Sequence, residues 1–296
     1  MTNTDSSNIR KKTALLRLLT AFKRRLNEQI NLCQSIVFEY GTVDAIIDND
    51  FSQEYVVHDY VFYCFTKACK SLMAVSILLE NKLPEDAMSL LRSVYENYLH
   101  IIYVIQNPEN IDDFVHKKIG FYTGRLQHPV SQKGRKLSNQ VIDTKTGETL
   151  PYGVGISTLV SGSKYKYDQA VHTIMFPFLS EHTHPNMVAS GNYRDDDDDD
   201  DIHYSYWQAS NTLQAAFFAL YISTLILSES LTFEALVEIK EIKYECRQSM
   251  KLCKRFLTLM EFPNQFDTLP NDIQNRLTEL ADHLSRRERC YLKPYT

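Results

Sequence analysis

The segment from Pro84 to Gln106 constrains the fold more than any other part of this chain of 296 residues. A proline and two acidic residues begin it and Asn107-Pro108 ends it, which is typical of an α-helix with these boundaries. Its polar residues form one stripe, about 140° wide at 100° per residue; the stripe consists of Ser89, Arg92, Ser93, Glu96, Asn97 and His100. All other residues from Met88 to Ile105 are apolar or tyrosine. This pattern predicts a helix that other helices surround on most of its circumference.

Helical periodicity covers most of the remaining chain. Apolar residues recur at steps of three and four over residues 8–40, and similar patterns predict helices over about 53–81, 110–126, 165–179, 204–229, 232–260 and 270–287. We find no internal repeat and no convincing amphipathic strand pair. We therefore expect an all-α fold, a multi-helix bundle in one domain over residues 1–296. Residues 1–46 would form a basic N-terminal helix that packs on the bundle or extends from it.

Two long segments interrupt the helical pattern. Residues 128–164 hold five of the nine glycines, and we expect an excursion in a long irregular loop there, with a small hairpin around Thr144–Thr149 at most. Residues 182–203 contain His182, His184, Pro185 and a run of aspartates, and we expect a second irregular loop. Pro177 is expected to kink or stop the helix before this second loop.

Composition bears on where the protein resides. No uninterrupted apolar run reaches the ~18 residues that a transmembrane helix needs, so we expect no membrane span. The polar, basic residues 1–12 are not followed by the apolar core of a signal peptide. The six cysteines form no CxxC pair and suggest buried thiols in a reducing compartment. These features predict a cytoplasmic protein.

The charge is distributed unevenly along the chain. The net charge of -5 depends on seven consecutive aspartates at 195–201, which we expect to form a solvated loop. The N-terminal helix carries a cationic face that could contact the phosphates of a nucleic acid; this face consists of Arg10, Lys11, Lys12, Arg17, Lys23, Arg24 and Arg25. An outer helix of the bundle and a membrane-surface helix are the alternatives. Further basic residues near the C-terminus and at Lys133-Gly134-Arg135-Lys136 favour nucleic acid over membrane.

The polar stripe of residues 84–106 is the first candidate site. A stripe facing bulk water usually carries lysines and glutamates, whereas small polar residues, one arginine, one glutamate and one histidine fit a polar cleft better. Arg92 and Glu96 stand at i and i+4 and can pair. We predict that both act in catalysis and that the remaining stripe residues contact a ligand; these are Ser89, Ser93, Asn97 and His100. The alternative is a structural ion pair beneath a loop.

The second candidate site is the segment Ser180-Glu181-His182-Thr183-His184-Pro185-Asn186. His184 could act as a general acid and base near neutral pH, with Ser180 beside it and His182 and Asn186 as ligand contacts. The alternative is that the histidines cap the helix or form ordinary hydrogen bonds. No ligand spacing matches a known metal pattern, so we expect no metal and no cofactor. Arg276 and His283 share one face of a later helix, which we expect to be solvated.

The two candidate-site segments together resemble a known family. Leu90-Leu91-Arg92-Ser93-Val94-Tyr95-Glu96, followed by Phe178-Leu179-Ser180-Glu181-His182-Thr183-His184-Pro185, resembles an uncharacterised family of bacterial helical proteins with an LLRS-x-x-E helix and a later histidine-proline. The resemblance covers residues 56–230 or so and implies Arg92, Glu96, Ser180 and His184 as its site. More distantly, the chain resembles the HEPN superfamily, in which many members are metal-independent ribonucleases of toxin and anti-phage systems. Those pair an arginine with a histidine, commonly across a dimer; Arg276 and His283 are the candidates here, with Leu277 where a polar residue is usual.

Two functions follow as expectations. The first is an RNA-directed effector, ribonuclease-like and belonging to a toxin or anti-phage defence system, in which Arg92 stabilises phosphorane charge and Glu96 orients Arg92 or His184. The second is a noncatalytic helical module that binds a nucleotide, a small anionic ligand or a protein partner. The expected partners are RNA and a second copy of the chain, since the helices are rich in aromatic residues.

Overall fold

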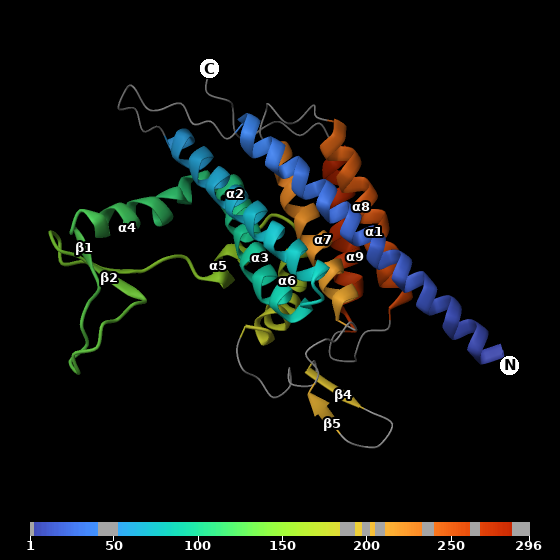
Figure 1. The fold of residues 1–296 in the computed structure, drawn as a ribbon. Helices are drawn as coiled ribbons and strands as arrows, with labels where there is room; N and C mark the ends of the chain where they lie inside the picture. The colour runs from blue at the N-terminus through green and yellow to red at the C-terminus, as the bar shows by residue number, and fades with distance from the viewer. Residues whose placement is uncertain are drawn as a thin grey trace.

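The computed structural model describes residues 3–40, 53–183, 193–196, 202–204, 211–232, 240–260 and 267–285. The predicted all-α fold is confirmed: a bundle of long helices forms the body of the protein (Figure 1). The helices of the bundle are α1 (Asn3–Tyr40), α2 (Gln53–Glu80), α3 (Pro84–Gln106), α6 (Asp168–Glu181), α7 (Thr212–Glu229), α8 (Lys240–Leu259) and α9 (Leu269–Ser285). Helix α3 has the two boundaries that the sequence predicts.

Helix α7 lies at the centre of the bundle and packs against α1, α3 and α8. Most of its residues are apolar, on every side of the helix, and nearly all of them are buried. Among the residues that the structure describes, two segments could cross a membrane by length and composition alone, Thr212–Thr232 and Val56–Glu80. The first is wholly buried inside the bundle and the second is less than half buried. The apolar character of α7 is therefore what a core helix requires, and the absence of a membrane span stays a prediction.

A buried glutamine connects three helices of the bundle. Gln29 of α1 is fully buried, and its amide nitrogen donates to Thr224 Oγ1 of α7 at 3.0 Å and to Ser249 Oγ of α8 at 2.8 Å. Ser223 of α7 donates to the amide oxygen at 2.5 Å. Because a buried amide without partners would be costly, these bonds determine how α1 lies on α7 and α8.

A buried arginine connects the last helix to the middle of the chain. Arg276 of α9 is 0% exposed, and its Nε lies 2.6 Å from Asp168 Oδ1 of α6. Its Nη2 donates to the hydroxyl oxygen of Tyr98 of α3 at 2.8 Å, and its guanidinium lies 3.7 Å from the ring centre of Tyr165. The expectation that Arg276 lies on a solvated face was wrong, because Asp168 and two aromatic rings replace water around the charge.

The excursion at 128–164 contains more regular structure than the sequence predicts. After α4 (Asp112–Tyr122), strands β1 (Leu126–Gln127), β2 (Gln140–Asp143) and β3 (Thr149–Pro151) form an antiparallel sheet, and the short helix α5 (Ile156–Ser161) follows. The small hairpin expected around Thr144–Thr149 is confirmed, with Ile142 opposite Thr149 and Gly147 at a φ of +73° in the turn. The sheet projects from the bundle beside α4 (Figure 1).

Helix α6 passes through Pro177 and ends at Glu181, so of the two expectations at this proline the early stop was wrong and the kink stays a prediction. Pro177 and Thr173, whose carbonyl loses its helical hydrogen bond, both lie on the exposed side of α6, where water can replace the missing donor. In the second break, β4 (Arg194–Asp196) pairs antiparallel with β5 (Ile202–Tyr204), so the first two aspartates of the run belong to a strand. Short 3-10 helices at Pro108–Ile111 (η1) and Ser230–Thr232 (η3) complete the described chain.

Candidate functional site

The polar stripe of α3 divides between two environments. Ser93, Glu96, Asn97 and His100 line a pocket, whereas Ser89 and Arg92 lie against the end of α6. Glu96 takes part in both, because it lines the pocket and its Oε1 lies 3.3 Å from Arg92 Nε. The single cleft that the sequence predicts is therefore two adjoining sites that share one carboxylate.

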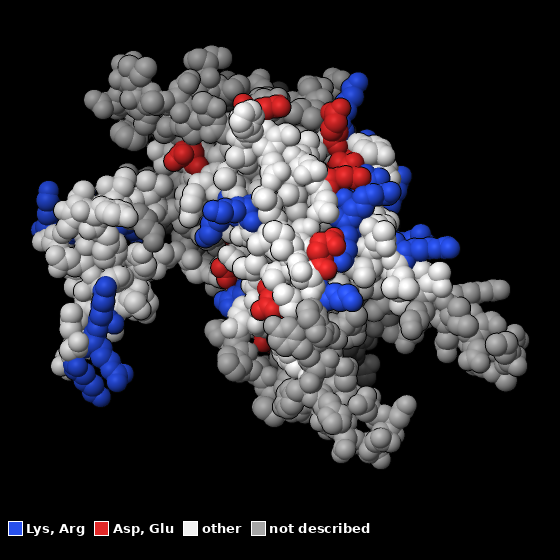
Figure 2. Space-filling model, viewed as in Figure 1, with Lys and Arg blue, Asp and Glu red and all other residues white. Residues whose placement is uncertain are grey.

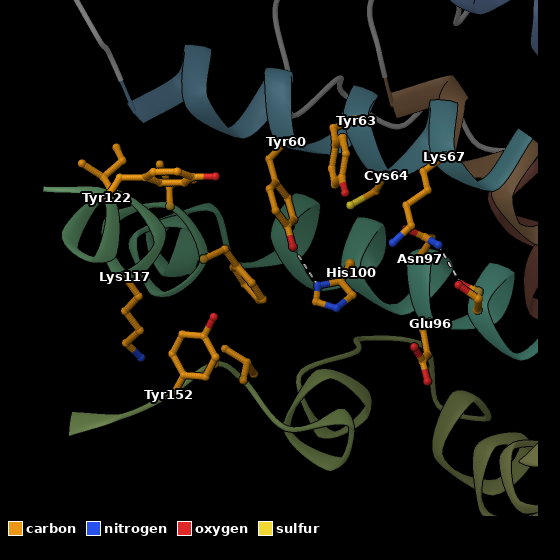
Figure 3. A pocket seen from close by; sticks show the side chains of 16 residues that line it. Tyr60, Tyr63, Cys64, Lys67, Glu96, Asn97, His100, Lys117, Tyr122 and Tyr152 are labelled. Atoms are coloured by element: carbon orange, nitrogen blue, oxygen red, sulfur yellow. Dashed lines mark hydrogen bonds between the residues drawn. The ribbon is translucent and has the colours of Figure 1, made fainter. Parts of the chain in front are cut away.

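The pocket has a volume of about 640 Å³ and lies between α2, α3, α4 and the residues after β3 (Figure 3). It forms because Tyr60, Cys64 and Lys67 of α2, spaced by four and three residues, face Ser93, Asn97 and His100 of α3 with the same spacing. The remaining lining residues are Tyr63, Glu96, Phe114, Val115, Lys117, Ile119, Tyr122, Tyr152, Gly153 and Val154. This volume lies within the range of small-molecule sites in proteins.

His100 and Tyr60 form a hydrogen-bonded pair on the pocket wall. The hydroxyl of Tyr60 lies 3.0 Å from Nδ1 of His100 (Figure 3). Burial lowers the pKa of His100 to about 4 and raises the pKa of Tyr60, so at neutral pH the imidazole is neutral and the phenol is protonated. In this neutral pair the tautomer of the imidazole sets the direction of the bond: Tyr60 donates to Nδ1 when Nε2 carries the ring proton, and Nδ1–H donates to the phenol oxygen when it does not.

Cationic side chains enter the pocket from two helices. Lys67 comes from α2 and Lys117 from α4 (Figure 3). Within the described ranges, no carboxylate lies within ion-pair distance of Lys67. Among the described side chains that line the pocket, Glu96 is the only acidic one, and it already pairs with Arg92. The pocket is therefore suited to an anion.

The neighbouring cysteine does not add a nucleophile to the pocket. Cys64 is 2% exposed, and burial raises the pKa of its thiol to about 12. The thiol stays protonated at neutral pH, and a protonated thiol is a poor nucleophile.

The second part of the stripe holds α3 to the end of α6. Ser89 Oγ donates to the carbonyl of His182 at 2.5 Å, and Arg92 Nη1 donates to Thr183 Oγ1 at 3.1 Å. The Arg92 guanidinium lies 4.9 Å from the ring centre of Phe176. These contacts match the alternative that we set against catalysis, a structural ion pair.

The predicted residues of the Ser180–Asn186 segment are only partly described. Ser180 Oγ donates to the carbonyl of Phe176 within its own helix at 2.7 Å. Burial lowers the pKa of His182, and its Nδ1 is buried without a hydrogen-bond partner among the described residues. His184 and Asn186 lie outside the described residues. The structure therefore brings Ser89 to His182 and Arg92 to Thr183, and it tests neither His184 nor Asn186.

Three cations of the basic N-terminal helix already have partners in the bundle. Lys23 Nζ donates to the carbonyl of Leu79 at 2.8 Å and lies 3.7 Å from Glu80, and Arg24 lies 3.9 Å from Glu28. Arg25 pairs with Glu28 at 2.7 Å and with Glu245 of α8 at 2.8 Å. Arg17 is exposed, and the side chains of Arg10, Lys11 and Lys12 lie outside what the structure describes. These pairs favour the alternative of an outer helix for the region around Lys23–Arg25.

The sequence reasoning missed the part of the pocket that comes from outside α3. The α2 triplet of Tyr60, Cys64 and Lys67 has a helical spacing that could have indicated it. The contributions of Lys117 and Tyr152 have no such signal, because they depend on how α4 and the small sheet fold back over α3.

The chain was compared with known proteins. No curated protein and no solved structure matches it. Every pocket-lining residue lies between Tyr60 and Val154. The region that contains them, residues 58–202, matches the model of a family of unknown function (DUF5677), over just under half of the chain and in agreement with the resemblance to an uncharacterised family.

Proposed function

We propose that the protein binds a nucleotide, a planar base carrying one or more phosphates, in the pocket between α2, α3 and α4. The observation that carries the proposal is the combination of several aromatic rings with two lysines in one pocket of about 640 Å³. This proposal is a more specific version of the second function expected from the sequence, a noncatalytic helical module that binds a nucleotide or another small anion.

The apolar wall suits a planar base. Tyr60 and Phe114 lie with their ring centres 5.1 Å apart, and Tyr63 and Tyr152 add two further rings to the lining. Aromatic rings that line a pocket can stack on any of the bases, because every base has a flat π-face. Ser93 and Asn97 supply polar groups at the α3 wall, where they can hydrogen-bond the edge of the base.

The cations suit the phosphate. The ammonium of Lys67 has no carboxylate partner among the described residues, and Lys117 adds a second positive charge. An ammonium group is a common phosphate ligand, acting as a point charge. The neutral ring of His100 adds a further hydrogen-bonding nitrogen, Nε2, without requiring a counter-ion.

Binding rather than catalysis is supported by the protonation states of the lining. Cys64 remains a thiol, and a histidine with a pKa of about 4 exchanges few protons at neutral pH. These two residues could otherwise have served as nucleophile and general base. The pocket thus holds groups that recognise a ligand, and the shifted pKa values of Cys64 and His100 disfavour the one as a nucleophile and the other as a general base near pH 7.

The test is calorimetric titration of the purified chain with mononucleotides and with inorganic phosphate, beside the variants Lys67→Gln and Lys70→Gln. Lys67 and Lys70 are both exposed on the same helix and only Lys67 lines the pocket, so Lys70→Gln is the matched control. We expect a nucleotide to bind wild type and Lys70→Gln equally, and Lys67→Gln at least tenfold more weakly. Absence of binding of any nucleotide at millimolar concentration, or equal binding by both variants, would contradict the proposal.

The RNA-directed effector is the second candidate. It is favoured by the gathering of Ser89, Arg92 and Thr183 at the end of α6, directly before His184 in the chain. A HEPN-like use of Arg276 with His283 has less support, because Arg276 is fully buried in its pair with Asp168. RNA as partner, a homo-oligomer and a cytoplasmic location accompany this candidate as predictions.

An RNA cleavage assay tests this second candidate, with wild type, Arg92→Lys and His184→Ala, in the presence and absence of EDTA. We expect cleavage by wild type alone, with no effect of EDTA. If all three folded proteins leave total RNA and tRNA intact, the ribonuclease hypothesis fails and nucleotide binding is unaffected by that result.

A further inference from the structure

A second hairpin projects from the small sheet between β1 and β2. Leu137 donates its backbone N–H to the Pro129 carbonyl at 2.8 Å, and Ser131 donates to the Arg135 carbonyl at 2.8 Å. Val130 and Lys136 form an antiparallel bridge, and Gly134, at a φ of +74°, closes the turn. We call residues 129–137 the basic hairpin. Its backbone is hydrogen-bonded across the turn, and the hairpin therefore has a defined shape.

The basic hairpin carries three exposed cations, Lys133, Arg135 and Lys136. Within the described part of the chain, none of the three has a carboxylate within ion-pair distance, unlike Lys23 and Arg25 of α1. Basic side chains gather at the tip of this projection, well separated from the mixed charges of the bundle (Figure 2). Unpaired cations on a projecting turn are the electrostatic arrangement that binds a polyanion.

The basic hairpin and the pocket wall belong to one structural unit. Tyr152 of the pocket follows β3, and its backbone N–H donates to the carbonyl of Asn139, which directly precedes β2. The Tyr152 ring packs against His128 at 5.0 Å and Phe121 at 5.3 Å between ring centres. His128 Nδ1 in turn lies 2.8 Å from the carbonyl of Gln140. A ligand that leaves the pocket past Tyr152 therefore meets the unit that carries the basic hairpin.

We propose that the basic hairpin binds the phosphate backbone of a single-stranded nucleic acid, one nucleotide of which occupies the pocket. This inference rests on the proposed nucleotide binding and names the source of the nucleotide. A base inside a duplex is paired and stacked, so only an unpaired base can enter a pocket lined by Tyr60, Phe114 and Tyr152. The cations of the hairpin contact phosphates, which explains why they need no carboxylate partners on the protein.

The experiment measures fluorescence anisotropy of a labelled 12-nucleotide RNA, the DNA of the same sequence and an RNA duplex, at several salt concentrations. The test variant is Lys133→Gln/Arg135→Gln/Lys136→Gln. The matched control is Arg247→Gln/Lys251→Gln/Arg255→Gln, which removes three exposed cations from α8 instead. Mononucleotide binding is measured for all proteins by calorimetry, as above.

We expect the hairpin variant to bind single-stranded RNA at least tenfold more weakly, with mononucleotide binding unchanged. Because each neutralised phosphate contributes about 0.7 to the slope of log K against log salt for single strands, the slope should fall by about 2 in the hairpin variant. The α8 control should change neither quantity. Lys67→Gln should weaken both the strand and the mononucleotide.

Each contrary result has its own meaning. If mononucleotides bind but the hairpin variant keeps the wild-type strand affinity, the inference is overturned and the proposed function stands. If strands bind through the hairpin while mononucleotides do not bind and Lys67→Gln has no effect, the proposed function and its link to the hairpin are both overturned. Equal affinity for the duplex and the single strand would overturn the requirement for an unpaired base.

Discussion

Replacing Arg276 by methionine is expected to destabilise the protein severely. Methionine keeps much of the aliphatic volume but removes the charge that faces Asp168 at 2.6 Å. The two side chains are 0% and 3% exposed, so Asp168 would be left as a buried carboxylate without its cation. Breaking a buried pair on one side costs about 3–5 kcal/mol, and a domain is stable by about 5–15 kcal/mol in total. Arg276→Met should therefore remove a large share of the free energy of unfolding.

Urea denaturation followed by circular dichroism measures this loss. The midpoint should fall with the slope m unchanged, and the melting temperature should fall by roughly 6–20 °C, at about 2–4 °C per kcal/mol. Arg247→Met, at an exposed position of α8, is the control and should stay within about 0.5 kcal/mol of wild type.

A double-mutant cycle separates the ion pair from the loss of packing. Asp168→Asn removes the negative charge, and its amide oxygen can still accept from Ser163 Oγ, which lies 2.6 Å from Asp168 Oδ2. We expect Arg276→Met/Asp168→Asn to recover at least about 2 kcal/mol relative to the sum of the single losses. Our reasoning would be refuted if Arg276→Met cost less than about 1 kcal/mol, or if the two single losses simply added.

The remaining predictions concern the pocket wall and the junction before α6. The native state binds fewer protons than the unfolded chain between pH 4 and 6.5, because burial lowers the pKa of His100 from 6.5 to about 4. The free energy of unfolding should therefore fall as pH is lowered through this range, by up to about 3 kcal/mol at 1.36 kcal/mol per pKa unit. If His100→Gln kept the wild-type slope of this free energy against pH, His100 would not be the cause of the pH dependence. Gly162→Ala would place a Cβ 2.6 Å from the Tyr103 ring, so urea melts should show a loss of about 1–3 kcal/mol. Gly155→Ala is the control, since its nearest contact is 3.7 Å away, and equal losses in both variants would contradict the steric explanation.

The comparison of sequence and structure is most informative at α3. The start at Pro84, the end at Gln106 and the polar stripe could all be read from local spacing and end signals. The division of the stripe could not be predicted, because Ser89 and Ser93 have the same chemistry in the sequence. One donates to the end of α6 and the other lines the pocket, and only the packing of α2 and α6 distinguishes them.

Arg276 shows the same limit more sharply. Its spacing from His283 placed both residues on one face of the helix, and we expected that face to be solvated because most arginines lie at the surface. Its burial depends on Asp168, 108 positions earlier in the chain, and on Tyr98 of α3. A period of 3.6 residues identifies the face of a helix on which a residue lies and carries no information about the partner that meets that face.

The amino-acid sequence by itself determined the all-α class, the limits of α3 and the small hairpin at Thr144–Thr149, because periodicity, end signals and turn residues act within a few positions of one another. The tertiary structure alone decided the pocket and the buried ion pair. Lys67, His100, Lys117 and Tyr152 form one site only because α2, α3, α4 and the sheet converge there. This arrangement depends on contacts between residues far apart in the chain, and local sequence patterns carry no information about such contacts.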